Sequence, residues 1–144
     1  MEKIDLLPAA LLNKLQAYCA RGEHCPSQIK RKIILEGGNE EIATQIINQL
    51  EKDNFINTAR FCRAFVHDKV LYQSWGRFKI RMMLQALELP ENDITAALQT
   101  IDLKQYNKNL TKLAETQRTK TQEQKIRFLL QRGFTYDEIN AIQL

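Results

Sequence analysis

The chain has 144 residues, of which 44% are hydrophobic and 26% are charged, as in a folded soluble protein with one ordinary core or a short array of repeats. Its five glycines and three prolines leave little room for a turn-rich β architecture. No stretch approaches the roughly 18 apolar residues of a membrane span. Lys14 interrupts the first apolar run, which lacks the layout of a signal peptide, so the expected location is the cytoplasm.

Three cysteines, Cys19, Cys25 and Cys62, form no C-x-x-C pair. In a cytoplasmic chain such cysteines are expected to be reduced and buried as small apolar residues. Cys25 with His24 and one distant residue leaves a metal site conceivable, but the spacing of a metal site is absent. We therefore expect neither a metal nor a cofactor.

A first group of three helices is predicted over residues 9–55, after a short lead-in at residues 1–8. Apolar residues at helical spacing predict its first helix over residues 9–21. Pro26 begins the second helix, because the N–H that proline lacks would be unpaired at a helix start. Asn39 caps the third helix with its side chain.

The same order repeats in a second group, predicted over residues 56–102. Asn57 caps its first helix, a residue at or near Ser74 begins its second, and Pro90 begins its third.

A third group is predicted over residues 103–144. Thr121 with Gln124, and Thr135 with Glu138, have the spacing of capping boxes, which predicts a helix start at each pair.

The last helix of each group begins in a similar way. An acidic residue directly precedes Ile42, Ile94 and Ile139, at spacings of 52 and 45 residues. There is no sustained alternation of apolar and polar residues and no Asn-Gly or Asp-Gly hairpin signal. We therefore predict an all-α fold of about nine helices, in three tandem three-helix repeats that form an elongated, curved, solenoid-like array.

Positive charge is concentrated in two blocks. Residues 60–81 contain six bases and one acid, and residues 104–132 contain eight bases and two acids. Residues 82–103, between them, contain four acids and no base. This distribution indicates a basic face rather than a basic tail, although any single basic side chain is explained equally well as a solvated surface residue.

No catalytic motif is found. The chain has no phosphate-binding glycine loop, no G-x-S-x-G elbow and no H-E-x-x-H metal helix. Its two histidines, His24 and His67, lie on different predicted elements and are interpreted as surface or interface residues. We therefore expect a binding protein and not an enzyme.

A tight corner is predicted at Trp75 and Gly76. Trp75 is interpreted as packing this corner, with stacking on a nucleic-acid base as the alternative. Gly76 is interpreted as allowing the chain to turn tightly. The helix that follows is expected to place on its inner side the apolar residues Phe78, Ile80, Met82 and Leu84.

Arginines at helical spacing mark a candidate binding surface. Arg77 and Arg81 are four residues apart and Arg60 and Arg63 are three apart, so the members of each pair share a helix face, and the four guanidinium groups are expected to converge. Guanidinium groups form paired hydrogen bonds with phosphate and carboxylate, which suits DNA or an acidic protein groove. The residues predicted to bind a partner or DNA are Arg60, Arg63, Lys69, Arg77, Lys79, Arg81, Lys120, Lys125, Arg127 and Arg132.

Three motifs then occur in order along the chain. They read A-R-G-E-H-C-P-S-Q-I-K-R-K-I, then A-R-F-C-R-A-F-V with W-G-R-F-K-I-R-M-M-L-Q-A-L-E-L, and finally R-F-L-L-Q-R-G-F. Together they resemble the N-terminal, central and C-terminal motifs of the RecX family, the regulatory proteins that modulate the RecA recombinase. The resemblance runs from about Leu12 to the end of the chain.

Four positions depart from the family pattern. Asn57 stands in place of an aspartate, and Cys25 in place of a capping serine, which cysteine replaces poorly. Met83 and Gln28 stand in place of glutamates. Any ion pairs that those glutamates form between helices are absent here.

The resemblance implies a regulator in DNA repair, recombination and the SOS response. It implies binding in the helical groove of the RecA filament, with inhibition of ATP hydrolysis and strand exchange as the expected effect. It also implies contact with the phosphates of single- or double-stranded DNA, and a monomer is the expected state. Two other hypotheses stay open: a helical-repeat protein that binds nucleic acid regardless of sequence and without a recombinase, or a scaffold for an acidic partner.

Overall fold

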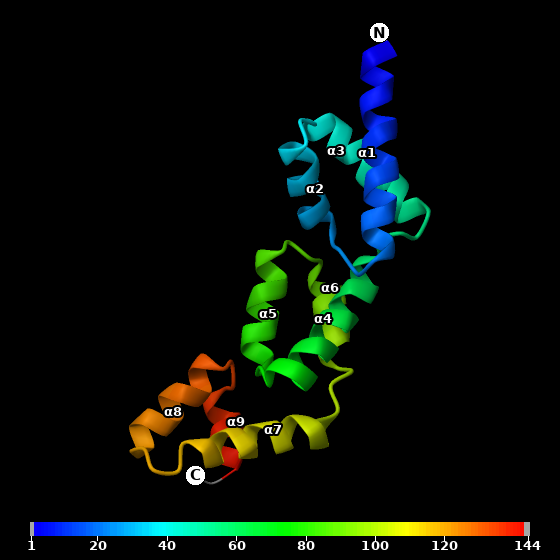
Figure 1. Ribbon diagram of the computed structural model, residues 1–144. Coiled ribbons are helices and arrows are strands. Elements are labelled where there is room, and N and C mark those ends of the chain that lie inside the picture. The colour runs from blue at the N-terminus through cyan, green and yellow to red at the C-terminus, as the bar shows by residue number, and fades with distance from the viewer. Residues whose placement is uncertain (1, 143–144) are drawn as a thin grey trace.

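The structure, a computed structural model, describes residues 2–142, and it describes side chains from residue 8 onward. Over these residues the chain forms nine α-helices and no strand, which confirms the predicted all-α fold (Figure 1). None of the described helices is both long and apolar enough to cross a membrane. The helices are α1 (Glu2–Ala20), α2 (Pro26–Leu35), α3 (Glu40–Lys52), α4 (Thr58–Gln73), α5 (Arg77–Ala86), α6 (Glu91–Leu98), α7 (Leu103–Thr116), α8 (Gln122–Gln131) and α9 (Tyr136–Ala141).

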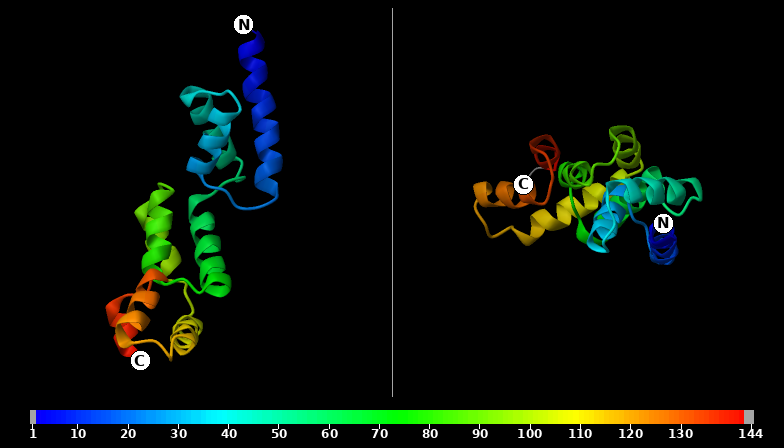
Figure 2. Two further views of the ribbon diagram at one scale, coloured as in Figure 1. Left: turned by 60° about the vertical axis from the view of Figure 1, so that its left-hand side comes forward. Right: turned by 90° about the horizontal axis from the view of Figure 1, so that it is seen from above.

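The helices follow one another as three groups along an elongated molecule, as Figures 1 and 2 show. We call α1–α3, α4–α6 and α7–α9 the first, second and third triplets. The predicted boundaries at residues 55–56 and 102–103 fall in the connections before α4 and α7, and their role as repeat boundaries stays a prediction.

The buried apolar residues form two clusters. One is made by the first triplet, with Leu15, Ile33 and Leu50 among its members. The other runs through the second and third triplets together, from Phe61 to Ile139, so these two triplets share a core.

The helix starts follow the local rules expected from the sequence. The side chains of Asn39 and Asn57 each accept a backbone N–H three residues later, at 2.9 Å. Thr121 and Thr135 form the two predicted capping boxes. Each box satisfies two backbone N–H groups that have no partner inside the helix.

Gln28 stabilises the start of α2, where Cys25 is the N-cap residue. Its side-chain oxygen accepts the backbone N–H of Cys25 at 3.1 Å. Pro26 at the first helical position needs no hydrogen-bond partner for its nitrogen. The Gln28 side chain therefore satisfies the backbone N–H of the N-cap residue.

The predicted start of the first helix is wrong. α1 begins at Glu2 rather than near residue 9, and it continues through Pro8. Proline removes only one backbone donor, and here it does not end the helix. The described part of the predicted lead-in is therefore helical, while Met1 lies outside the described residues.

At the corner between α4 and α5 the next helix begins near Ser74, as predicted: α5 starts at Arg77 with Gly76 as its N-cap, while Ser74 itself ends α4 in the left-handed conformation, with φ 53° and ψ 41°. The role of Gly76 differs from the prediction. Gly76 has φ −80°, which any residue adopts, so the chain does not need its conformational freedom for the turn. The reason for glycine at this position lies in the third triplet.

Gly76 touches the backbone of Gly133. Its N–H donates to the carbonyl oxygen of Arg132 at 2.8 Å, and the N–H of Phe78 donates to the carbonyl oxygen of Gly133 at 3.1 Å. A Cβ atom on Gly76 would lie 2.2 Å from the carbonyl carbon of Gly133, which is closer than such atoms approach. Gly133 itself has φ 99°, a left-handed conformation that favours glycine.

Fewer residues of α5 face the core than predicted. Ile80 and Leu84 are fully buried, but Phe78 is 56% exposed and Met82 is 54% exposed. Two residues along an α-helix correspond to a rotation of about 200°, so the neighbours of Ile80 at that spacing face away from the core. The prediction for Phe78 and Met82 is therefore wrong.

The first and second triplets are joined by polar contacts at Glu23 and Ser27. Ser27 donates its hydroxyl to the carbonyl oxygen of Leu87 at 2.8 Å. Glu23 accepts Arg60 Nε at 2.7 Å. The adjacent Cys25 is fully buried and belongs to the core of the second and third triplets.

All three cysteines are buried with free thiols. Burial raises the pKa of Cys62 to about 11, so this thiol stays protonated and unreactive at neutral pH.

We expect the Gly76→Ala substitution to lower the free energy of unfolding by about 1–3 kcal/mol, because the added methyl group overlaps the Gly133 backbone. Urea denaturation measures the loss, and hydrogen exchange should show faster opening in α8 and α9. Gly22→Ala is the matched control, because a Cβ atom there meets nothing within 4 Å. Equal stability of the two variants would contradict the close contact.

We expect part of the stability to depend on the protonation of His24. Its ring stacks on Tyr18 with the centroids 3.8 Å apart, and burial lowers the pKa of His24 below its ordinary value of 6.5. The unfolded chain therefore binds a proton more readily than the folded chain. Stability should fall as the pH decreases through about 6.5, and this loss should level off below the folded pKa.

Urea denaturation between about pH 8 and about pH 5 measures this effect. His24→Phe keeps a stacked ring without a titrating group, so its stability should fall less on acidification. His67→Gln is the control at an exposed histidine. An unchanged pH dependence in His24→Phe would assign the loss to other groups.

Candidate functional site

Two lysines lie over the ring of the single tryptophan, in the α4–α5 connection of the second triplet. The Nζ atom of Lys79 lies 4.3 Å from the centre of the Trp75 ring, and that of Lys69 lies 5.0 Å from it. Phe65 packs edge-on against Trp75 with the centroids 6.4 Å apart. The indole therefore packs against Phe65 at the corner, and it also holds two ammonium groups by cation–π attraction.

Arg132 adjoins this group from the third triplet. Its guanidinium donates to the carbonyl oxygen of Gln73 at the C-terminal end of α4, where the helix dipole favours a cation. Its Nε atom is buried without a hydrogen-bond partner among the described residues. We call Lys69, Trp75, Lys79 and Arg132 the joint cluster, because the backbone contact between Gly76 and Gly133 brings them together.

The joint cluster has little negative charge beside it. Among the described residues its one ion-pair contact is between Lys69 Nζ and the neighbouring Asp68, at 3.8 Å, and the Asp68 side chain is 55% exposed. A pair at this distance with a half-exposed carboxylate contributes little. Most of the positive charge in the joint cluster therefore has no carboxylate beside it.

Arg60 has a different environment. Besides Glu23, its guanidinium donates to the carbonyl oxygens of Asn54 and Phe55 at 3.2–3.3 Å. These bonds tie the α3–α4 connection to the segment before α2. Arg60 thus joins the first two triplets, a role that the helical spacing of the sequence did not indicate.

Arg77 joins the second and third triplets. Its Nη1 atom lies 2.7 Å from Glu138 Oε2, and its guanidinium lies 4.3 Å from the ring centre of Tyr106. The backbone N–H of Arg77 donates to the hydroxyl of Tyr106 at 2.9 Å. Burial raises the pKa of Tyr106 well above its ordinary value, so its hydroxyl stays neutral.

Glu138 and Tyr106 were missed as members of this junction. The capping box that Glu138 forms with Thr135 explains its presence locally, and so conceals its second contact with Arg77. Asn109 was missed as well: it is buried in α7 and donates its amide to the carbonyl oxygen of Val70, at 2.8 Å. A polar residue among the apolar positions of α7 was the available signal.

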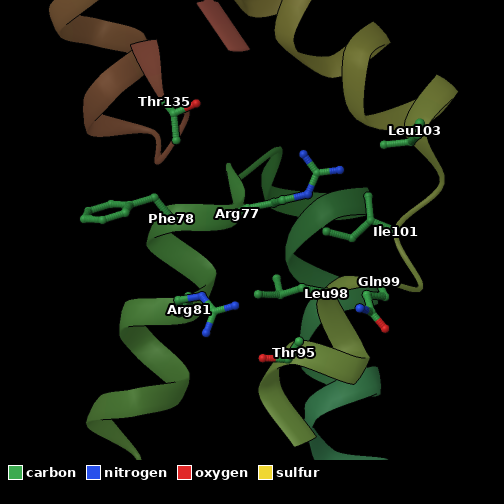
Figure 3. Close-up of a pocket in the computed structure, with 9 residues that line it drawn as sticks. All are labelled: Arg77, Phe78, Arg81, Thr95, Leu98, Gln99, Ile101, Leu103 and Thr135. Atoms are coloured by element: carbon green, nitrogen blue, oxygen red, sulfur yellow. The ribbon is translucent and has the colours of Figure 1, made fainter. Parts of the chain in front are cut away.

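Arg81 and Arg77 share one pocket, shown in Figure 3. Arg81 pairs with Glu91 at the start of α6. The pocket has a volume of about 500 Å³ and lies between α5, the α6–α7 segment and Thr135. The spacing of these two arginines thus did predict a shared surface.

The remaining predicted residues lie apart from these groups. Arg63 is exposed on α4 and makes no ion pair with any described residue. Lys120 and Arg127 line a shallow hollow of about 210 Å³ between the end of α7 and α8. Lys125 is half-buried in α8. The predicted basic residues therefore occupy several surfaces, and convergence is seen for the joint cluster, for Arg77 with Arg81, and for Lys120 with Arg127.

Comparison with known proteins agrees with this arrangement of helices. The family description "RecX, second three-helix domain" matches residues 57–98, which contain the whole second triplet. Regulatory protein RecX of Clostridium botulinum (strain Alaska E43 / Type E3) is 31% identical over 125 residues, covering 80% of this chain. The chain belongs to the RecX family.

Solved RecX structures have the same fold. A crystal structure of a regulatory protein RecX superposes with a TM-score of 0.83 over 95% of this chain and 71% of that one, at 21% identity. The crystal structure of RecX from Lactobacillus salivarius gives a TM-score of 0.78 over 94% of both chains, also at 21% identity. The present chain spans 58% of the length of the Clostridium botulinum RecX protein.

We expect Tyr106→Phe to lower the free energy of unfolding by about 1–2 kcal/mol, because it leaves the N–H of Arg77 without its acceptor at the start of α5. Urea denaturation measures the change. Tyr72→Phe removes a hydroxyl from a side chain that is 74% exposed, and it should leave the stability unchanged. Equal stability of the two variants would show that the Tyr106 hydroxyl contributes nothing to the junction.

Proposed function

We propose that this protein regulates the RecA recombinase by binding in the helical groove of its filament, and that it inhibits ATP hydrolysis and strand exchange there. Membership of the RecX family supports a regulatory role. The observation that carries the proposal is the joint cluster, a basic group with little negative charge beside it where the second and third triplets meet.

An elongated array suits a filament better than it suits a single globular partner. Three triplets arranged end to end present successive surfaces along one direction (Figure 1). Each surface contacts a neighbouring protomer weakly, and the contacts add because binding through one triplet raises the effective concentration of the next.

Inhibition follows from binding one state of the filament better than another. A groove-bound regulator that bridges protomers favours the spacing at which its triplets fit, and it shifts the filament toward that spacing. ATP hydrolysis and strand exchange slow to the extent that they require the protomers to move relative to one another. This mechanism needs no catalytic group in the regulator.

The joint cluster is the part proposed to contact DNA inside the filament. Ammonium groups neutralise phosphates. Lys69 and Lys79 both lie against the indole of Trp75, which brings two such groups to one place. The same combination favours a second candidate function, the binding of single-stranded nucleic acid without a recombinase.

The two functions are separated by the DNA-dependent ATPase activity of RecA. We expect the purified protein to lower this activity at substoichiometric ratios, and the double substitution Lys69→Gln and Lys79→Gln to weaken the inhibition several-fold. Arg31→Gln with Lys52→Gln is the matched control, because both residues are exposed in the first triplet and the change in net charge is the same.

Direct binding to an oligothymidine strand is measured alongside, through the emission of Trp75. The lysine variant should reduce the slope of log affinity against log salt by about 0.7 for each phosphate that it no longer neutralises. No change in ATPase activity at equimolar protein would refute the regulatory proposal. Oligonucleotide binding that persists in that case would leave the second function standing.

A further inference from the structure

The pocket that contains Arg77 and Arg81 differs in character from the joint cluster. Its volume of about 500 Å³ is within the range of ligand-binding clefts. Both guanidinium groups extend from α5 toward the α6–α7 segment, as Figure 3 shows. Leu98, Ile101 and Leu103 form an aliphatic patch on the opposite side of the pocket, beside the polar residues Thr95 and Gln99.

The two arginines retain the capacity to bind an anion. In each, Nη1 contacts a carboxylate of the protein, Glu138 for Arg77 and Glu91 for Arg81. No described residue accepts a side-chain hydrogen bond from their Nε or Nη2 atoms. Each arginine side chain is 34% exposed and lines the pocket.

The carboxylates beside the arginines decide which anion fits. Glu91 and Glu138 offset most of the positive charge, so a strand with a phosphate at every nucleotide would meet repulsion as well as attraction. A single carboxylate brings one negative charge instead of a row of them, so it meets less of this repulsion, and it accepts hydrogen bonds from the remaining guanidinium donors. An aliphatic group next to it would cover Leu103, which is 59% exposed.

We propose that this pocket binds a peptide segment of a partner protein, in which an acidic side chain stands next to an aliphatic one. This goes beyond the proposed function, because it assigns protein recognition to a surface separate from the joint cluster. Hydrogen bonds from the Nε and Nη2 donors of the two arginines select the acidic residue, and the aliphatic side chains across the pocket select its neighbour. The pocket would be available in the isolated chain, without a recombinase or DNA.

The test is a titration of the ¹⁵N-labelled full chain with a pool of capped hexapeptides that have Leu-Asp-Leu at the centre and Gly, Ser and Ala at the flanks. The matched pool has Leu-Asn-Leu. We expect the acidic pool to shift the amide signals of α5 and the α6–α7 segment, with an affinity about tenfold higher than the neutral pool, the ratio expected for a charge-assisted hydrogen bond.

Two variants probe the opposite walls. Arg81→Gln removes one guanidinium from a partly exposed position, and Leu103→Asp places a negative charge across from both arginines. Each should weaken binding of the acidic pool at least several-fold. Arg63→Gln, which lies on α4 outside the pocket, should bind as the unchanged chain does.

Three outcomes would overturn the proposal. The first is that neither peptide pool shifts the pocket signals at millimolar concentration. The second is that both pools bind with equal affinity, and the third is that Arg81→Gln binds the acidic pool as well as the unchanged chain does. An oligothymidine strand is added in a separate titration. If it shifts the pocket signals more strongly than the acidic pool does, the pocket is a nucleic-acid site and the assignment to a peptide is wrong.

Discussion

The direct backbone contact between Gly76 and Gly133 determines how the second and third triplets are arranged. Two N–H groups at the start of α5 donate to carbonyl oxygens at the end of α8, a distance of more than fifty residues along the chain. Backbone hydrogen bonds have fixed direction, whereas apolar side chains pack in several ways. A pair of such bonds therefore sets the orientation of α8 and α9 against α5. The ion pair between Arg77 and Glu138 and the hydrogen bond from Arg77 to Tyr106 follow from that orientation.

The same contact separates two kinds of positive surface. Lys69, Lys79 and Arg132 lie around Trp75 with little negative charge beside them. The arginines of α5 instead lie in an aliphatic pocket, each beside a glutamate. Formal charge alone does not distinguish these surfaces, because both are rich in basic residues. Their surroundings do: one suits a dense line of phosphates, and the other suits an isolated carboxylate with an apolar neighbour.

The sequence predicted what local chemistry controls. Asn39, Asn57 and the two threonine capping boxes marked helix starts, because each cap involves residues only three positions apart. The predictions from the sequence failed where contacts between residues far apart in the chain determine the structure. No local rule indicates that Gly76 meets Gly133, so glycine was assigned to the turn. The spacing of Arg77 and Arg81 predicted a shared face, but their glutamate partners come from other helices and were not predictable. The three ordered motifs supplied the family, which no single residue identified.

The division of the apolar core into two clusters has a consequence for cooperativity. The second and third triplets share one cluster, whereas the first triplet has its own, linked to the rest mainly by Arg60, Ser27 and Cys25. Units that share a core unfold together, while a unit with its own core opens separately. A force or a denaturant acting on the molecule should therefore release the first triplet as one step and the remaining six helices as another. In mechanical terms the second and third triplets should behave as one unit, and the first triplet as a second unit that opens separately.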